Sequence, residues 1–180
     1  MTLNYDKLIT SWHDKACNEE YFSKFVFEYL AFIAYLKKKK FTEENSDRDV
    51  IQKLKQDDAV KEKYLGEVRN SLQISEWWRE IMNELDRDSL VNVSRDHECA
   101  EVNKWWNCSS SGPCEPVESS GVAGKINGLN DWVNMVEFWY SVRNNFFHGG
   151  KDPNDARDKL FVENGYKTLR PLVEILISSE

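Results

Sequence analysis

The sequence predicts an all-α protein, a bundle of about four to six helices that forms a single domain over residues 1–180. Two observations predict this class: apolar residues recur at helical spacing along most of the chain, and helix-capping residues precede several of these segments. A length of 180 residues is enough for one compact domain with its own core. A hydrophobic content of 41% with 31% charged residues indicates a folded globular chain rather than a disordered one.

The first 40 residues predict two helices. Residues 1–17 have a loose apolar side and are expected to form a short helix. We expect Asn18 to cap a second helix, whose segment 21–36 is apolar almost all round, as is typical of a central helix. The lysine run 37–40 ends it; these lysines can bind phosphate, but a solvated helix end is the favoured interpretation.

Residues 46–85 predict two more helices. Ser46 is a capping residue for a helix over about 47–65, which Gly66 is expected to break. The next helix has a clear apolar stripe, made of Trp78, Ile81, Met82 and Leu85. The Trp77–Trp78 pair can stack on bases, but tryptophans at helical spacing more often belong to a core, which we favour.

Residues 88–126 show the least regular pattern. Leu90 to Val93 is compatible with a short strand, and 107–128 is rich in Ser, Gly and Pro, which predicts a long loop. This loop is interpreted either as a lid beside a site or as an insertion. A zinc site here would use thiolate and imidazole ligands, but the spacing lacks a Cys-x-x-Cys pair, and scattered free thiols are favoured. The candidate ligands are His97, Cys99, Cys108 and Cys114.

The charge is distributed unevenly. The formal net charge is −7, which argues against a broad basic surface for nucleic acid. Residues 143–170 nevertheless hold six Lys or Arg and four Asp or Glu, a local +2, which favours recognition of individual phosphates. The sequence shows no signal peptide and no apolar run of about 20 residues, and four cysteines suggest a reducing compartment. We therefore expect a cytoplasmic protein with no membrane partner.

The chain is organised around Tyr140–Lys151, at the end of a helix that Asn130 or Asp131 can cap. Arg143 falls in the middle of the apolar stripe of this helix, so it needs a partner, or the stripe faces something other than a plain core. The stripe consists of Trp132, Met135, Val136, Trp139 and Phe146. The opposite face is expected to be narrow and polar, with Asn134, Glu137, Ser141 and Asn145.

His148 follows Arg143 by five positions, which is about 140° around an ideal helix. The two side chains can meet only if the helix ends before His148, which Gly149–Gly150 permits, or if they meet across two chains. A last helix follows, with Asp152 as its expected cap and Pro153 at its first position. Pro171 is expected to kink or split that helix.

The order Arg143, Asn144, His148 at the end of an inner helix resembles the signature of the HEPN family, the higher eukaryotes and prokaryotes nucleotide-binding domains. The double glycine and the following helix are most similar to the Apea-like branch. The resemblance covers about residues 125–178, a motif-bearing helix pair preceded by residues 1–124. It implies a metal-independent endoribonuclease without a cofactor, whose composite Arg/His site forms at a homodimer interface. It also implies a role as a toxin or in antiviral defence, with an inhibitory or regulatory protein partner left open.

The residue types suit cleavage of RNA, in which the 2′-hydroxyl attacks the adjacent phosphate and the 5′-oxygen leaves. Histidine suits the two proton transfers because its pKa lies near the working pH. Arginine offers the pentavalent phosphate a permanent charge and a fork of donors. The predicted catalytic residues are therefore Arg143, His148 and Asn144, with Asn145 and Lys151 as candidates for substrate binding.

Two other functions compete with this prediction. A non-catalytic HEPN-like module would bind nucleotides or a protein through its aromatic surface. A structural helical domain would use Arg143 in a buried ion pair or over Trp139, with His148 as a favourable group at a helix C-terminus.

Overall fold

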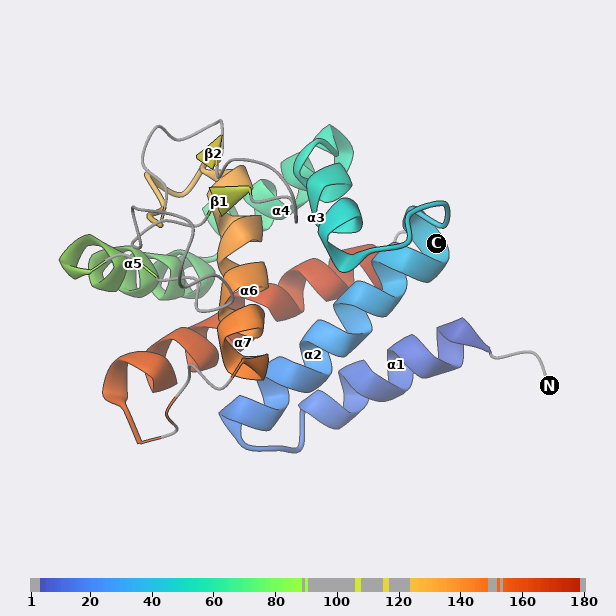
Figure 1. Cartoon of the computed structure of the whole chain (residues 1–180), viewed down its shortest axis with the longest axis horizontal. Helices are drawn as coiled ribbons and strands as arrows, with labels where there is room; N and C mark the ends of the chain where they lie inside the picture. The colour runs from blue at the N-terminus through green and yellow to red at the C-terminus, as the bar shows by residue number, and fades with distance from the viewer. Residues whose placement is uncertain are drawn as a thin grey trace.

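The computed structural model of the chain describes residues 4–88, 90, 106–107, 115–116, 124–148, 152 and 154–178. Helices dominate this part of the chain, which confirms the all-α class (Figure 1). The helices are α1 (Tyr5–Ala16), α2 (Tyr21–Tyr35), α3 (Asp47–Lys55), α4 (Asp58–Asn70), α5 (Leu72–Arg87), α6 (Trp132–Phe147) and α7 (Ala156–Ser178), with a π-helical turn η1 (Leu36–Lys40) after α2. Strands β1 (Trp106–Asn107) and β2 (Glu115–Pro116) have two residues each and pair antiparallel.

Helix α6 is the most enclosed element. It runs through the middle of the fold, with α7 crossing it and α5 and α2 on either side (Figure 1). Eleven of its 16 residues are buried, on nearly every side of the helix, whereas six of the 15 residues of α2 are buried. The central helix is therefore the one that carries the Arg143 motif.

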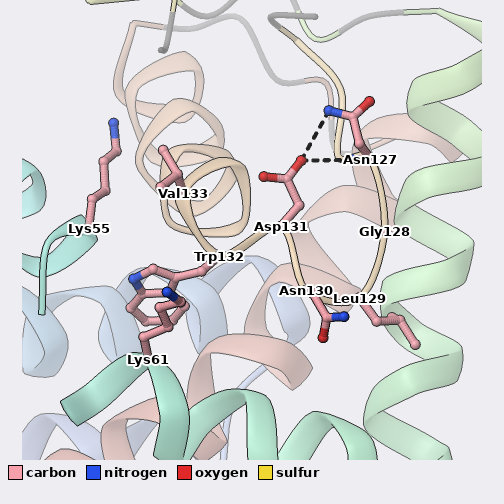
Figure 2. Close-up of a pocket in the computed structure, with 9 residues that line it drawn as sticks. All are labelled: Lys55, Lys61, Asn127, Gly128, Leu129, Asn130, Asp131, Trp132 and Val133. Atoms are coloured by element: carbon pink, nitrogen blue, oxygen red, sulfur yellow. Dashed lines mark hydrogen bonds between the residues drawn. The ribbon is translucent and has the colours of Figure 1, made fainter. Parts of the chain in front are cut away.

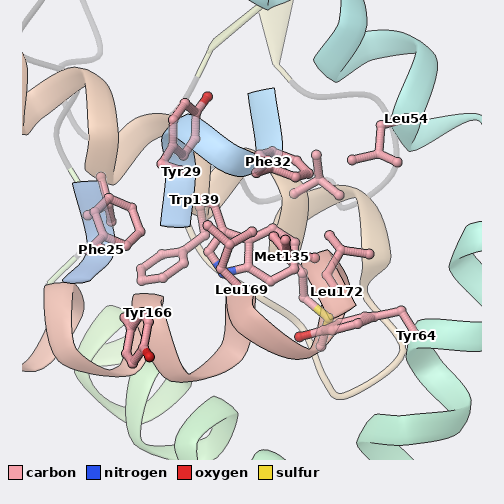
Figure 3. Close-up of a cluster of buried hydrophobic side chains, with 14 of the residues drawn as sticks. Phe25, Tyr29, Phe32, Leu54, Tyr64, Met135, Trp139, Tyr166, Leu169 and Leu172 are labelled. Carbon is pink, nitrogen blue, oxygen red and sulfur yellow. The ribbon is translucent and has the colours of Figure 1, made fainter. Parts of the chain in front are cut away.

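The core is built around Trp139 of α6, which is fully buried (Figure 3). Its ring centroid lies 5.5 Å from Tyr64 of α4 and 5.4 Å from Trp78 of α5. The polar tips of these rings are paired: Trp139 Nε1 donates to Thr168 Oγ1 at 3.0 Å, and Trp78 Nε1 donates to the Tyr64 hydroxyl at 2.9 Å. Trp78 is thus a core residue, as expected, while Trp77 is half-buried.

The predicted helix over 47–65 is wrong as a single element. Ser46 caps α3 as expected, since its Oγ accepts from the Asp49 N–H at 3.0 Å. The break comes at Gln56 and Asp57, where the Asp57 carboxylate accepts from the Val60 N–H at 2.9 Å and begins α4. Gly66 lies inside α4 and does not break it, because one glycine in a helix costs only about 1 kcal/mol. This division gives seven α-helices in the described part, one more than expected.

Asn18 does not cap the second helix. Its Nδ2 donates to the Asp14 carbonyl at the end of α1, at 3.4 Å, and Glu20 occupies the N-cap position of α2 without a side-chain capping bond. A capping residue near a helix boundary can serve the preceding helix instead of the following one, which the sequence alone does not resolve.

The last helix begins later than predicted. Asp155 is its capping group, since its carboxylate accepts from the Asp158 N–H at 2.9 Å, while Asp152 accepts from the Asn154 N–H in the turn before it. Pro171 lies within α7, which is continuous from Ala156 to Ser178 and is not split.

Several sequence predictions fall on residues that the structure does not describe. These are the zinc candidates His97, Cys99, Cys108 and Cys114, the segment 91–93 of the expected strand, Pro153, and Gly149, Gly150 and Lys151. Within the described ranges, no three His, Cys, Asp or Glu side chains come together as a group that could hold a metal. None of the described helices has the length and apolarity needed to cross a membrane.

Candidate functional site

Arg143 lies near the C-terminal end of α6, and its guanidinium has two polar partners. Its Nη2 donates to Asp47 Oδ2 at 3.2 Å, at the start of α3, and its Nη1 donates to Asn144 Oδ1 at 2.9 Å. The side chain remains 28% exposed, so a ligand from solvent can still reach it. Asp47 is thus a partner of the kind that the position of Arg143 on an apolar stripe requires.

Two aromatic rings support the same guanidinium. Arg143 Cζ lies 4.9 Å from the ring centroid of Phe147 and 5.6 Å from that of Tyr29. A guanidinium over an aromatic face is attracted by the ring quadrupole, which offsets part of the cost of leaving water. The rings and Asp47 together explain how a charged side chain is accommodated beside the core.

Asp47 joins a third segment to this cluster. Its Oδ1 lies 3.1 Å from Lys37 Nζ in η1, so η1, α3 and α6 meet at one carboxylate. Two other lysines of the predicted solvated run are also in ion pairs, Lys39 with Asp6 at 2.5 Å and Lys40 with Asp57 at 2.8 Å. The run therefore ties η1 to neighbouring helices.

The narrow polar face of α6 that the sequence predicts is buried. Glu137 is 2% exposed and is bound by Arg48 at 2.6 Å and by Lys55, both from α3. Burial lowers the pKa of Lys55, and the Glu137 carboxylate opposes that shift. The other polar residues of this face are also buried, namely Asn134, Ser141 and Asn145.

Arg48 extends the cationic cluster toward the surface. Its guanidinium carbon lies 5.1 Å from the ring centroid of Tyr140, which is half-buried on α6. Arg48 itself is 20% exposed. Two arginines, Arg143 of α6 and Arg48 of α3, therefore lie beside α6, and each is held by a carboxylate and an aromatic ring.

Tyr29 contributes a buried phenol beneath Arg143. Its hydroxyl has no hydrogen-bond partner among the described residues, and its ring is 1% exposed. Burial raises the pKa of this phenol well above its ordinary value, so the group is neutral at physiological pH.

His148 is the C-cap of α6 and is exposed. Its N–H donates to the Asn144 carbonyl at 3.0 Å, and its φ of −93° and ψ of 13° leave the backbone close to helical. The polar and aromatic contacts of Arg143 in the described chain do not include His148. The helix thus ends at Phe147, before His148, as one of the two predicted arrangements requires. Even so, the described contacts of Arg143 within one chain do not reach His148.

The remaining predicted site residues occupy different environments. Asn144 is 7% exposed, and its side-chain oxygen Oδ1 accepts from Arg143, so it orients the guanidinium. Asn145 is 2% exposed and lies within the fold. Lys151 lies outside the described residues.

A second polar cluster, not predicted from the sequence, joins α1, α2 and α7. His13 Nδ1 lies 2.7 Å from Oε1 of Glu28, a carboxylate that is fully buried. The hydrogen bond to Glu28 raises the pKa of His13, while burial raises the pKa of Glu28 itself. Arg170 of α7 binds Glu174 at 2.9 Å and Cys17 Sγ at 2.7 Å beside them. The sequence does contain one indication of this cluster, which is the position of Glu28 inside the apolar segment 21–36.

A cleft of about 520 Å³ lies at the opposite end of α6 (Figure 2). It is lined by Lys55, Lys61 and residues 127–133. Its charged groups are engaged: Lys55 binds Glu137, Lys61 binds Asp58 at 3.3 Å, and Asp131 accepts from the Asn127 N–H at 2.8 Å. At 1.5 Å per residue it lies roughly 16 Å along the helix from Arg143, so it is a separate site.

Comparisons of this chain with protein families, with curated proteins and with solved structures find no match.

Proposed function

We propose that this protein is a metal-independent endoribonuclease of HEPN type that cleaves RNA through Arg143 and His148. The observation that carries the proposal is the environment of Arg143: a guanidinium 28% exposed, fixed by Asp47 and Asn144, and supported on two aromatic rings. A fixed, accessible guanidinium suits a phosphate whose charge grows during reaction, because it needs little reorganisation. The resemblance to the HEPN motif supplies the reaction class.

In this proposal the two side chains have distinct roles. Arg143 binds the phosphate that the 2′-hydroxyl attacks, and His148 transfers the proton to or from the reacting oxygens. Asn144 keeps the guanidinium in position through the 2.9 Å bond to its Oδ1. The reaction leaves a 2′,3′-cyclic phosphate on one product and a 5′-hydroxyl on the other.

A homodimer completes the proposed site. Within one chain the described contacts of Arg143 come from Asp47, Asn144, Tyr29 and Phe147, so the histidine is expected from a second copy. The exposed end of α6 at His148 is the surface through which two copies would bring their motifs together. A toxin or defence role, with an inhibitory or regulatory partner, belongs to the same proposal.

A non-catalytic nucleotide- or protein-binding module is the second candidate, and the Asp47 contact favours its protein-binding form. An anionic group 3.2 Å from the guanidinium competes with a phosphate for the same donor. A domain that only positions Arg143 for fold or partner contacts would keep this ion pair permanently.

The test is incubation of the purified protein with transfer RNA and a mixed RNA pool in EDTA. Cleavage by wild type that is lost in His148→Ala supports the nuclease. Cleavage that survives His148→Ala removes the catalytic role of that residue. RNA binding without cleavage by either form establishes the non-catalytic module instead.

A further inference from the structure

Phe147 is an exposed aromatic ring at the end of α6. Its side chain and that of Leu72 are the two exposed large hydrophobic groups in the described part of the chain, at 56% and 70%. Leu72 begins α5, whereas Phe147 is adjacent to His148 and contacts Arg143. A single exposed apolar ring is normal by itself, so what points to a ligand is the place of Phe147 beside Arg143 and His148.

Contacts from one side fix the ring. The Arg143 guanidinium carbon lies 4.9 Å from its centroid, and Phe146 meets it edge to face at 5.9 Å and 66°. Phe146 is itself packed on Phe22 of α2, with centroids 5.7 Å apart. The ring is thus held against Arg143 and Phe146 of α6 while more than half of its surface faces solvent.

We propose that Phe147 stacks one unpaired nucleobase of the RNA while Arg143 binds the adjacent phosphate. This inference rests on the proposed function. It assigns Phe147 as the residue that favours an unpaired nucleotide over a paired one. Every base offers an aromatic face, and stacking on an aromatic side chain is the usual way in which proteins hold unpaired bases.

Charge favours an unpaired strand over a duplex. Tight duplex binding requires several phosphate contacts from a basic surface, but the chain has a net charge of −7. Within the described residues, Arg143 is the cation in contact with Phe147, and Arg143, Lys37 and Arg48 each already bind a carboxylate. At such a site, stacking of one base on the exposed ring therefore contributes more to binding than contacts with the phosphates of a duplex.

The test measures binding of a short 2′-O-methyl RNA, which cannot undergo the 2′-hydroxyl attack, by fluorescence anisotropy. Phe147→Ala and Phe147→Leu are expected to weaken binding about 5- to 100-fold, because both lack an aromatic face. Phe147→Trp should retain the affinity, and Leu72→Ala, the matched exposed apolar control, should leave it unchanged. A set of RNAs, each with one abasic residue at a different position, tests the same contact from the ligand side. At the position that stacks on Phe147, the abasic residue should weaken binding to wild type as much as Phe147→Ala does. The same RNA should bind Phe147→Ala no more weakly than the intact RNA does.

Wild-type affinity in Phe147→Leu would overturn the inference, as would tighter binding of the annealed duplex than of the single strand. Loss of a dimer by Phe147→Ala in light scattering, in step with the loss of RNA, would also overturn it and make Phe147 an interface residue. If Phe147→Ala binds normally while His148→Ala ends cleavage, only the stacking role falls. If wild type binds and cleaves no RNA, the proposed function falls with it.

Discussion

Asp47 binds Arg143 across 96 positions of sequence, with Nη2 and Oδ2 separated by 3.2 Å. The contact joins the first residue of α3 to the last turns of α6, beside the ring of Phe147. The carboxylate fixes the guanidinium and also competes with any phosphate that approaches it. Asp47 therefore sets both the position and the availability of Arg143.

Asp47→Asn should raise the affinity for RNA several-fold, because the amide keeps the shape of the carboxylate but releases the guanidinium. The cost in the free energy of unfolding should be about 1 kcal/mol or less, since both side chains are more than a quarter exposed. RNA anisotropy and urea denaturation measure the two effects. Asp58→Asn, which removes an exposed ion pair with Lys61, is the matched control and should change neither. Weaker RNA binding by Asp47→Asn would mean that Asp47 only positions the guanidinium and does not compete with the phosphate.

Glu137→Leu should destabilise the fold by about 3–5 kcal/mol, because it leaves the buried Lys55 without its carboxylate. Urea denaturation followed by tryptophan fluorescence measures the loss. The double variant Lys55→Met/Glu137→Leu should recover most of it, since the buried lysine is removed and only Arg48, which is 20% exposed, then loses this carboxylate. An equal loss in the single and double variants would show that packing, rather than the ion pair, dominates at this position.

Gly165→Ala and Gly66→Ala should have opposite effects on stability. A Cβ at Gly165 in α7 would lie 3.1 Å from Phe25 Cε2, a fully buried ring, so the substitution should cost about 1–3 kcal/mol. No atom lies within 4 Å of a Cβ at Gly66, so alanine there should stabilise α4 by about 0.5–1 kcal/mol. Thermal unfolding of the two variants measures both effects. Stabilisation by both substitutions would mean that α2 and α7 lie farther apart than the 3.1 Å approach at Gly165 indicates.

The His13–Glu28 contact should make stability depend on pH. The hydrogen bond to Glu28 raises the pKa of His13 above its ordinary 6.5, so the folded state holds this proton more tightly. The stabilisation is complete below pH 6.5 and is lost as the pH rises through the raised folded-state pKa. Wild type should therefore lose stability relative to His13→Gln over that range, in urea midpoints compared from pH 6 upward. The groups facing His13 from α2 and α7 are Glu28, Glu174 and Arg170. Parallel midpoint curves for the two proteins would contradict the assignment.

The sequence predicts the helices well because their signals are local. The cap at Ser46 and the stripe of α5 depend on residues a few positions apart, and the structure confirms both. Asp131 occupies the predicted N-cap position of α6 but makes no side-chain capping bond. The break at Gln56–Asp57 was missed because Gly66 offered a stronger local signal. Helix α4 continues through Gly66 because residues before and after it in the sequence are buried in the core, namely Tyr64, Leu65 and Val68.

The environment of Arg143 was only partly predictable. Its place on an apolar stripe showed that it needs a partner, but no local pattern indicates Asp47, 96 positions away. The polar side of α6 was predicted, but its surroundings were not, since periodicity cannot distinguish a side that faces water from one that faces a buried ion network. Arg48 and Lys55 on α3 create that network with Glu137.

The measurement closest to the central claim is the chemistry of the RNA ends formed in EDTA by wild type, Arg143→Ala and His148→Ala. The account predicts new 2′,3′-cyclic phosphate ends from wild type and a loss of at least about 100-fold in rate for each variant, with helical content unchanged by circular dichroism. Cyclic phosphate ends formed by either variant at the wild-type rate would contradict it.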